Sequence, residues 1–343
     1  MQSVILAAGS STRAYPLTLT RPKPLLKVAN KTILERNIEA VKGLSEEIIL
    51  VVGYKKEMII DFAKKKFPGL KIKFVVQKEQ LGTGNAVSVL EECIRDKFLL
   101  LMGDNIYSKQ DVNEIAKRQY SILVKEVKSP ELFGVITEKN GILAGLIEKP
   151  SNPSSNLVSC ALYSLDKKIF ELLKKVKKSE RNEYELTDAI KELAKNEKVY
   201  CIHSGSCLQI SYPWDILEAD REIRRGKNSI GKGSKITGKV ENSSVGDNCE
   251  IKGDVISSVI MDNSIIEKGS VVEDSVIGEN VYFSGMAKSL INTVSIINGK
   301  PVNAGKLGAI IGENVKAKSV IIWPGCKIWP NKTINGDIKN DLY

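Results

Sequence analysis

Histidine is almost absent from this sequence: among 343 residues there is one, His203. Six cysteines are present, but no two of them form a Cys-x-x-Cys pair, so the spacing of a zinc finger is missing. We therefore expect the cysteines to be reduced and mostly buried rather than to hold a structural metal.

Long hydrophobic runs are also lacking. No apolar stretch approaches the roughly 20 residues that a membrane-spanning helix requires. The apolar run at residues 4–8 is too short for the core of a secretory signal, and no basic residues precede it. We expect a cytoplasmic protein without a membrane partner.

Acidic residues are fewer than basic ones, 41 against 51, which leaves a formal net charge of +10. Such an excess is common in nucleic-acid-binding proteins, but no recognised nucleic-acid motif accompanies it here. The lysines are spread along expected helices, as at residues 55–56 and 64–66, with acidic residues between the clusters. We interpret this charge as a solvated surface that suits anionic phosphate substrates, and we expect no nucleic-acid partner.

Short apolar runs alternate with helical patterns over the first two thirds of the chain. We expect strands at residues 4–7, 48–52, 72–76, 98–102 and 122–127. Apolar residues recur at helical spacing over 33–44 and 58–67, and further helices are expected at 186–194 and 214–224. This alternation predicts an α/β domain at residues 1–226, with a mostly parallel sheet covered by helices on both faces.

A different pattern fills residues 227–343. Aliphatic residues recur six apart, and several are followed by Gly and then Asn; the set includes Ile230 and Ile236, Val245 and Ile251, Ile260, Ile266 and Val272, and Ile322, Ile328 and Ile334. This period predicts a triangular parallel β-helix of hexapeptide repeats, with the aliphatic residues inside and Gly or Asn at corners that need a positive φ. Residues 284–308 break the period and are expected to bulge out as a loop.

The first expected strand runs directly into a turn of small residues, and such a turn is where α/β proteins bind ligands. Its sequence is Leu6-Ala7-Ala8-Gly9-Ser10-Ser11-Thr12-Arg13. Small residues let backbone N–H groups approach phosphate oxygens, and Arg13 adds a forked, charged donor. Further on, two prolines flank Lys23 and would stiffen its backbone, so that its charge could be aimed at a phosphate.

With these two segments, the chain resembles the sugar-phosphate nucleotidyltransferases. The motifs that carry the resemblance occur in the family's order: Leu-Ala-Ala-Gly-x-x-Thr-Arg at 6–13, Pro-Lys-Pro at 22–24, Gln-x-x-Gln-Leu-Gly-Thr-Gly at 77–84, Gly-Asp-Asn at 103–105, Phe-Gly-Val at 133–135, Glu-Lys-Pro at 148–150 and Glu-Tyr-Glu-Leu-Thr-Asp at 183–188. The resemblance covers residues 1–226 and implies a Rossmann-like domain. A left-handed β-helix tail also occurs in one branch of this family.

The resemblance implies a reaction in which a nucleoside triphosphate and a sugar 1-phosphate give a nucleoside-diphosphate sugar and pyrophosphate, with Mg²⁺. The sugar phosphate oxygen attacks the α-phosphorus in line, so the chemistry needs positioning and charge neutralisation rather than a covalent nucleophile. The near absence of histidine is consistent with that.

The same resemblance implies roles for individual residues. Arg13, Lys23 and Asp104 would be catalytic, and Asp104 would bind Mg²⁺. The nucleotide would be bound by Leu6, Ala7, Ala8, Gly9, Ser10, Ser11, Thr12, Gln77, Gly82 and Thr83. The sugar would be bound by Gly134, Glu148, Lys149 and Ser159. Taken alone, each charged residue could equally be a solvated charge or a cap, and Glu148 with Lys149 a surface ion pair.

Three positions depart from the family's pattern. Ser11 stands where Gly is usual, and its Cβ restricts φ, so the loop is expected to sit differently. Gln209 falls where the family has a second metal-binding Asp or Asn, which leaves its metal role doubtful. Residues 159–161 read Ser-Cys-Ala instead of Asn-Ala-Gly, which leaves the sugar selectivity open.

Alternatives remain at the level of function. UTP is the expected nucleotide and dTTP the next, with glucose 1-phosphate or N-acetylglucosamine 1-phosphate as acceptor; guanylyl transfer is disfavoured because a purine would be read differently. We expect no acetyl transfer by the tail, since the sole histidine lies before the repeats, and we expect the tail to form a homo-oligomer. The other class is a non-catalytic regulator, like the translation-initiation exchange-factor subunits of this architecture, but it would not need Arg13, Lys23 and Asp104 together.

Overall fold

The computed structural model describes residues 1–343, and the chain forms two compact units. The first comprises Met1–Ser10 and Leu34–Gln209, and the second comprises Ser11–Ile33 and Ile210–Tyr343. The stretch 11–33, which carries Arg13 and Lys23, therefore packs with the C-terminal part of the chain. No helix is both long and apolar enough to cross a membrane.

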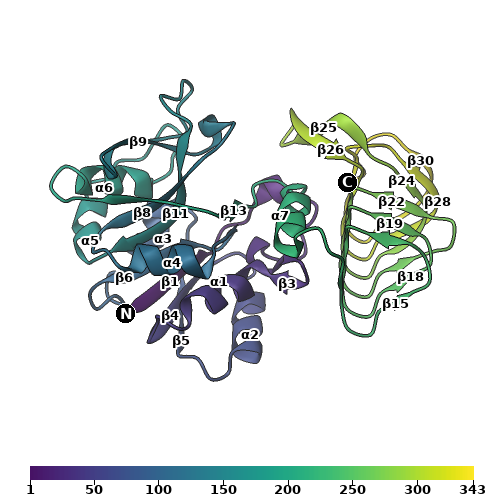
Figure 1. Cartoon of the computed structure of the whole chain (residues 1–343), viewed down its shortest axis with the longest axis horizontal. Coiled ribbons are helices and arrows are strands. Elements are labelled where there is room, and N and C mark those ends of the chain that lie inside the picture. The colour runs from purple at the N-terminus through teal and green to yellow at the C-terminus, as the bar shows by residue number, and fades with distance from the viewer. The chain divides into compact units, whose positions relative to one another are not determined.

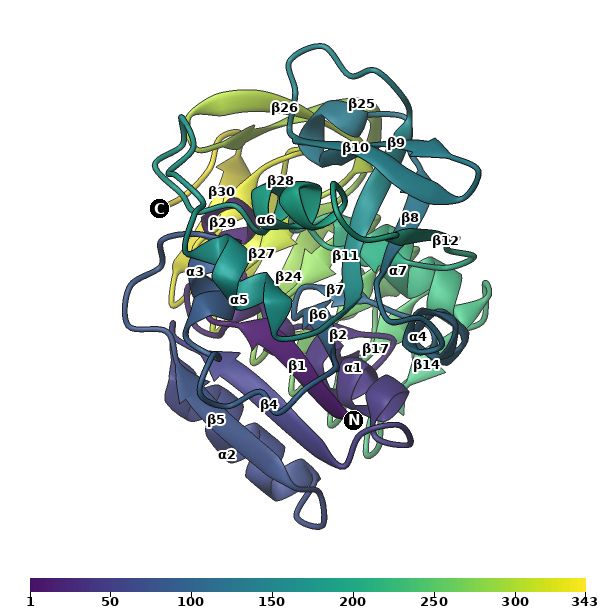
Figure 2. The same cartoon turned by 90° about the vertical axis from the view of Figure 1, so that its left-hand side faces the viewer.

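The first unit is built on a nine-stranded sheet in the order β5-β4-β1-β6-β11-β8-β12-β10-β9. Its strands are β1 (Gln2–Ala7), β4 (Glu47–Val52), β5 (Ile72–Val76), β6 (Phe98–Met102), β8 (Ser121–Glu126), β9 (Gly134–Lys139), β10 (Ile142–Glu148), β11 (Leu157–Leu165) and β12 (Tyr200–His203). Strands β5, β4, β1 and β6 are parallel, as is the β8–β12 pair, whereas β11 and β10 run antiparallel to their neighbours. Figure 2 shows β4 and β1 side by side with α2 beside β5. All five expected strands are present within one or two residues.

Helices of this unit bury one apolar face each. They are α1 (Ile33–Val41), α2 (Lys56–Lys66), α3 (Thr83–Ser88), α4 (Lys109–Ala116), α5 (Lys168–Leu173) and α6 (Leu186–Leu193). On α6, Leu186, Ala189, Ile190 and Leu193 fall on one side at helical spacing and are all buried. They share a core with α3, α5 and alternate residues of the sheet, such as Phe98. Helix α4 packs beside β8 and β11.

Each unit also contains short elements. They are the 3₁₀ turns η1 (Thr12–Ala14), η2 (Lys23–Leu25) and η3 (Pro130–Leu132), and the paired strands β2 (Lys27–Val28) with β3 (Lys31–Thr32) and β7 (Asn105–Ile106) with β13 (Leu208–Gln209). Turn η2 buries Lys23, Pro24 and Leu25, while the stiffness of the backbone around Lys23 stays a prediction.

The second unit contains α7 (Asp215–Arg224) followed by a left-handed β-helix of stacked coils, seen edge-on in Figure 1. One side is β14 (Ser229–Ile230), β17 (Ser244–Val245), β20 (Val259–Ile260), β23 (Val276–Ile277), β27 (Ile310–Ile311) and β29 (Lys327–Ile328). The other sides are β15 (Lys235–Ile236), β18 (Glu250–Ile251), β21 (Ile265–Ile266), β24 (Tyr282–Ala287), β28 (Lys316–Ile322) and β30 (Thr333–Ile338), with β16 (Val240–Glu241), β19 (Asp254–Ile256) and β22 (Val271–Glu273).

Gly and Asn have different tasks at the repeated corner. Asn248, Asn263 and Asn280 have positive φ, as expected for the tight turn. Gly246 does not; a Cβ there would lie 2.4 Å from Asp262 of the next coil. Glycine is needed at position 246 because coils approach closely, and the left-handed conformation two residues later is supplied by asparagine, or by Gly233 in the first coil.

Two expectations for the β-helix need correction. Ile230 and Ile236 do not point into a closed interior, because they belong to the first coil and are 45% and 37% exposed. Residues 284–308 are not an irregular loop: they contain an antiparallel hairpin of β25 (Leu290–Ile297) and β26 (Lys300–Leu307). The aliphatic residues of the inner coils, such as Val245 and Ile260, are fully buried as predicted.

Candidate functional site

The base of the turn after β1 is held by backbone contacts within the first unit. The Ala8 carbonyl accepts hydrogen bonds from the Tyr54 N–H at 2.9 Å and from the Gln80 side-chain amide at 3.0 Å. Gly9 is exposed, and a Cβ added there would meet nothing within 4 Å. A rigid base below an open glycine leaves room for an anion to reach backbone N–H groups.

Ser11 adopts a backbone conformation that usually favours glycine. Its φ of 54° and ψ of 47° lie in the left-handed region, directly before η1. The Ser11 carbonyl accepts hydrogen bonds from the Ala14 N–H at 3.0 Å and the Thr18 hydroxyl at 2.9 Å. Serine thus adopts a conformation that its Cβ disfavours, and the expectation that the loop sits differently from that of the family stays a prediction. Arg13, in η1, has its guanidinium carbon 6.0 Å from the centre of the Tyr212 ring.

Gln77 and the Leu-Gly-Thr-Gly loop come together in the first unit. The Gln77 side chain is buried and donates to Asn85 Oδ1 at 2.7 Å. Gly82 has a φ of 100°, and its missing Cβ would lie 2.7 Å from the Tyr184 carbonyl. The Thr83 hydroxyl accepts the Leu186 N–H at 3.1 Å, so it caps α6. The loop thus joins two of the sequence motifs, and Asn85 is a member that the sequence did not single out.

Asp104 follows β6 at the carboxyl end of the parallel strands. In the pairing of β13 with β7, Gln209 lies opposite Asn105, the neighbour of Asp104. A carboxylate and an amide oxygen are hard ligands of the type that Mg²⁺ prefers. No group of three or more His, Cys, Asp or Glu side chains that could hold a metal occurs in the structure. An ion held here would take its remaining ligands from phosphate and water.

Lys23 lies in the second unit and is only 3% exposed. Its Nζ donates to the Ile210 carbonyl at 2.8 Å. Near it, the Asp215 carboxylate accepts the backbone N–H groups of Ser211 and Tyr212, both at 2.7 Å. Burial raises the pKa of Asp215 to about 6, although these hydrogen bonds and the Lys23 charge lower it. Sequence reasoning did not single out Asp215, because nothing in its spacing marks it.

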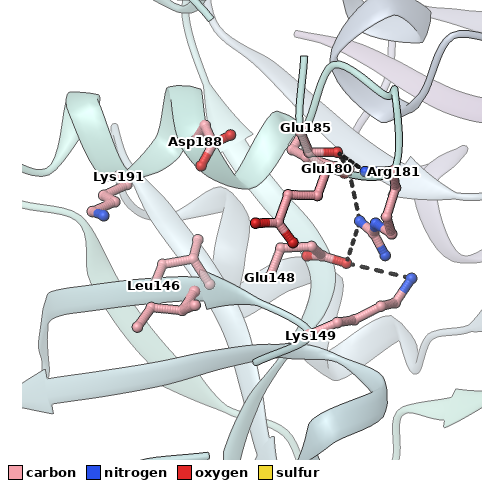
Figure 3. Close-up of a pocket in the computed structure, with 10 residues that line it drawn as sticks. Leu146, Glu148, Lys149, Glu180, Arg181, Glu185, Asp188 and Lys191 are labelled. Carbon is pink, nitrogen blue, oxygen red and sulfur yellow. Dashed lines mark hydrogen bonds and ion pairs between the residues drawn. The ribbon is translucent and has the colours of Figure 1, made fainter. Parts of the chain in front are cut away.

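Glu148 lines a cavity of about 270 Å³ in the first unit, shown in Figure 3. Its carboxylate lies 3.5 Å from Lys149 Nζ and 3.6 Å from Arg181 Nη2. Gly134 lies against it, since a Cβ there would be 3.2 Å from Glu148 Oε2. The structure thus brings together three of the four predicted sugar-binding residues, and the Glu148–Lys149 pair is part of a cavity wall.

The cavity also holds charged residues that the sequence did not assign. Arg181 pairs with Glu185 at 2.7 Å, and Asp188 lines the same wall one turn along α6. Burial and the neighbouring Glu185 raise the pKa of Asp188. Carboxylates are good acceptors for sugar hydroxyls, and the cations suit a phosphate. Glu185 and Asp188 could have been found from their motif, but Arg181 belongs to none.

Ser159 does not line this cavity. Its hydroxyl lies 3.1 Å from the Tyr163 hydroxyl and accepts the Ala161 N–H at 3.0 Å. Ala161 has a φ of 54°, at an irregularity of β11 where the family usually has glycine. The Ser159 hydroxyl is thus engaged in contacts within β11, and its assignment to sugar binding stays a prediction.

Comparison with known proteins agrees with these features. The nucleotidyl transferase family model matches residues 2–219. The "Bifunctional protein GlmU" of Methanocaldococcus jannaschii is 39% identical over 96% of this chain and 92% of the relative. The "Bifunctional sugar-1-phosphate nucleotidylyltransferase/acetyltransferase" of Sulfurisphaera tokodaii is 33% identical over 98% of both. The "UTP--glucose-1-phosphate uridylyltransferase AglF" of Haloferax volcanii is 36% identical over 65% of this chain and 97% of the relative.

A solved structure described as a putative glucose-1-phosphate thymidylyltransferase from Bacillus anthracis superimposes with a TM-score of 0.59 and 27% identity, covering 65% of this chain and 95% of that one. The family match extends over more than half of the sequence, and a relative above 30% identity spans nearly all of it. By these similarities, this chain belongs to the nucleotidyl transferase family.

Proposed function

We propose that this protein transfers a nucleotidyl group from UTP, or from dTTP, to a gluco-configured sugar 1-phosphate. An oxygen of the sugar phosphate attacks the α-phosphorus, and the bond from that phosphorus to the β-phosphate oxygen breaks. The bonding electrons leave with pyrophosphate, and the nucleoside-diphosphate sugar is the second product.

The observation that carries this proposal is the cavity around Glu148. Its wall has carboxylates of Glu148, Glu185 and Asp188 beside the cations of Lys149 and Arg181. A polyhydroxylated ring with one phosphate matches such a mixture, because hydroxyls donate to carboxylates and a phosphate accepts from cations. We assign Gly134, Glu148 and Lys149 to sugar binding.

The phosphate groups are assigned to other residues. The backbone of residues 6–12 would bind the triphosphate, and Arg13 would neutralise the departing β- and γ-phosphates. Lys23 would stabilise the charge that develops between the α-phosphate and the sugar phosphate. Gln77, Gly82 and Thr83 would bind the base. A Mg²⁺ ion would be held by Asp104 and Gln209, and it would neutralise phosphate charge when bound.

The choice of UTP first rests on two similarities. The Gln-x-x-Gln-Leu-Gly-Thr-Gly stretch resembles that of the uridylyltransferases, and AglF is named for UTP and glucose 1-phosphate. dTTP stays an alternative because the structural neighbour is named a thymidylyltransferase. N-acetylglucosamine 1-phosphate is the second candidate acceptor.

We further propose that the β-helix does not transfer acetyl groups, although two relatives are named bifunctional. The β-helix has no histidine that could act as a general base, since His203 lies in β12 of the first unit. The alignments with these relatives run over 392 and 407 residues, more than the 343 of this chain. The relatives therefore contain segments without a counterpart here.

Two assays test the proposed nucleotidyl transfer and the proposed absence of acetyl transfer. Pyrophosphate release is measured with Mg²⁺ for the four common ribonucleotides and dTTP against several sugar 1-phosphates, and thiol release from acetyl-CoA is measured with glucosamine 1-phosphate. We expect turnover with UTP or dTTP and a gluco-configured acceptor, and no thiol release. Absence of turnover with every pair in folded protein would favour the regulatory alternative.

A further inference from the structure

The segment that carries Lys23 is held on the β-helix by a partly buried ion-pair network. Arg21, two residues before Lys23, donates through Nη1 to Glu279 at 2.5 Å and through Nε to Glu313. The three side chains are 11%, 18% and 13% exposed, so water screens them only weakly. A planar guanidinium can bridge two carboxylates in this way, whereas a lysine has no such fork.

Glu279 and Glu313 occupy the same corner of adjacent coils. Each follows the glycine of an Ile-Gly-Glu-Asn repeat, and their coils are joined by the pairing of β23 with β27. Two carboxylates at equivalent points of neighbouring coils repel each other, and a cation between them removes that repulsion. The β-helix therefore presents a site that fits the Arg21 side chain.

Two further contacts fix the same segment on the preceding coils. Lys27 pairs with Asp262, which occupies the equivalent corner one coil earlier than Glu279. The Asn30 side-chain amide donates to the Val245 carbonyl at 2.9 Å and to the Ser229 hydroxyl at 3.0 Å. Anchors thus occur at residues 21, 27 and 30, on successive coils, and they bracket the turn η2 after Arg21.

We propose that Glu279 and Glu313 are positioning residues for nucleotidyl transfer, which act through Arg21 to hold Lys23 in place. This inference rests on the proposed function of Lys23. The β-helix would then support catalysis within its own chain, in addition to any role in oligomer assembly. A displacement of about 1 Å in a catalytic group can lower a rate by about a hundredfold, so loosening the anchor should be visible in turnover.

The test compares the double variant E279Q/E313Q with E267Q. Glu267 is a carboxylate of the same β-helix that pairs with Lys252, at 3.3 Å, and not with the segment 11–33. We expect the double variant to lose at least about tenfold in kcat, with a smaller change in KM, while circular dichroism shows that it stays folded. Unchanged kcat in the double variant, or an equal loss in E267Q, would overturn the proposal.

A cycle with Arg21 separates positioning from direct contact with substrate. If Arg21 acts only through the two carboxylates, then R21M, E279Q/E313Q and the triple variant lose kcat by the same factor. Losses that multiply would mean that the carboxylates do not act through Arg21.

Hydrogen exchange of the amides in residues 16–30 gives a readout that needs no activity. We expect these amides to exchange at least about tenfold faster in E279Q/E313Q than in wild type or E267Q, because a local anchor has been removed. Absent turnover in the wild type would refute the proposed function, while unchanged exchange would refute the anchor itself.

Discussion

Asp215 is the residue whose protonation should be visible in the stability of the protein. Burial raises its pKa from 3.8 to about 6 in the folded chain. Between these values the folded state holds a proton that the unfolded state has released. The free energy of unfolding therefore falls as the pH rises from about 4 to 6, by about 3 kcal/mol from this group alone.

The variant D215N should not lose stability in this way between pH 4 and 6. Its amide oxygen can still accept a backbone N–H group, and its charge does not change with pH. We expect the melting temperature of wild type, relative to D215N, to decrease as the pH is raised from 4 to 6 and then to level off. Parallel profiles over this range would show that Asp215 titrates normally.

Lys23 and Asp104 should be required for turnover but not for folding. Alanine at either position is expected to remove most turnover, at least about a hundredfold, because we propose that Lys23 neutralises phosphate charge and that Asp104 holds the Mg²⁺ ion. Since Lys23 is buried, K23M provides a variant of similar volume, and circular dichroism checks the fold. The exposed pair of Lys117 and Glu114 supplies the controls K117M and E114Q, which should retain full activity. Near-normal rates for K23A or D104A would refute the assignment.

Ser11 pays a conformational cost that glycine would not. L-residues in the left-handed region are less stable by about 1–2 kcal/mol, partly offset by the larger backbone entropy of glycine in the unfolded chain. We expect S11G to stabilise the protein by up to about 1 kcal/mol in urea unfolding. Ser10 has no positive φ, so S10G should be destabilising, and the opposite order would contradict this account.

A candidate site residue could be predicted from the sequence when it belongs to a motif. It could not be predicted when only the folded structure brings it close to the other residues. Glu148 and Gly134 were both named, and they lie in contact. Arg181 was not, because it reaches Glu148 across 33 positions and belongs to no motif. Ser159 was named, but its hydroxyl is engaged by Tyr163, an interaction that depends on the irregular backbone of β11.

Among elements of the first unit, the junction of α3 with the segment before α6 leaves no room for a side chain at Gly84. Gly84 lies inside α3, where alanine normally improves helix stability by about 1 kcal/mol. Here a Cβ would lie 2.9 Å from the Tyr184 carbonyl and 3.2 Å from Leu173. We expect G84A to destabilise the protein by about 1–3 kcal/mol and to raise the KM for the nucleotide.

The control for this prediction is Gly43, after α1, where a Cβ would meet nothing within 4 Å. G43A should be neutral or slightly stabilising in the same urea unfolding experiment. If G84A were as stable as G43A, the backbone around Tyr184 would have to yield more readily than its hydrogen bonds suggest.

Element types were largely predictable, because buried strands read as continuous apolar runs. The strands 72–76 and 98–102 match β5 and β6 without error. The hairpin of β25 and β26 was not predicted. Its alternate residues face solvent, and it interrupts the six-residue repeat of the β-helix. The six-residue repeat predicts the coils. An insertion between coils does not follow that repeat and can be predicted only from the alternation of its own residues.

At the scale of the whole molecule, the β-helix has an apolar surface beside its hairpin. Met286, Leu290, Ile321 and Trp323 line a hollow of about 330 Å³, and Leu290 is 63% exposed. An apolar patch of this kind commonly marks a protein interface. We propose that it contacts a second copy of the chain, in keeping with the expected homo-oligomer.

Light scattering after size-exclusion chromatography tests this assembly. We expect wild type to elute as an oligomer at micromolar concentration and L290K/W323K to shift toward the monomer, because charges in an apolar interface are costly. I230K places a charge on an exposed aliphatic residue of the first coil and should leave the assembly unchanged. A monomeric wild type would refute the prediction.

The grouping of residues 11–33 with the β-helix could not be predicted from sequence. The hydrophobic pattern changes near residue 228, and this change predicts one unit before that residue and one after it. The contacts that join the segment to the coils are made over separations of 258 and 292 residues, for which no local pattern exists.

Those separations also set an order of events during synthesis. Translation proceeds at roughly 5–20 residues per second, so Arg21 leaves the ribosome some tens of seconds before Glu313 does. Throughout that interval Arg21 lacks at least one of its two carboxylate partners. The arrangement around Lys23 is thus completed only when the last coils are made, which leaves incomplete chains without the anchor that full-length protein has.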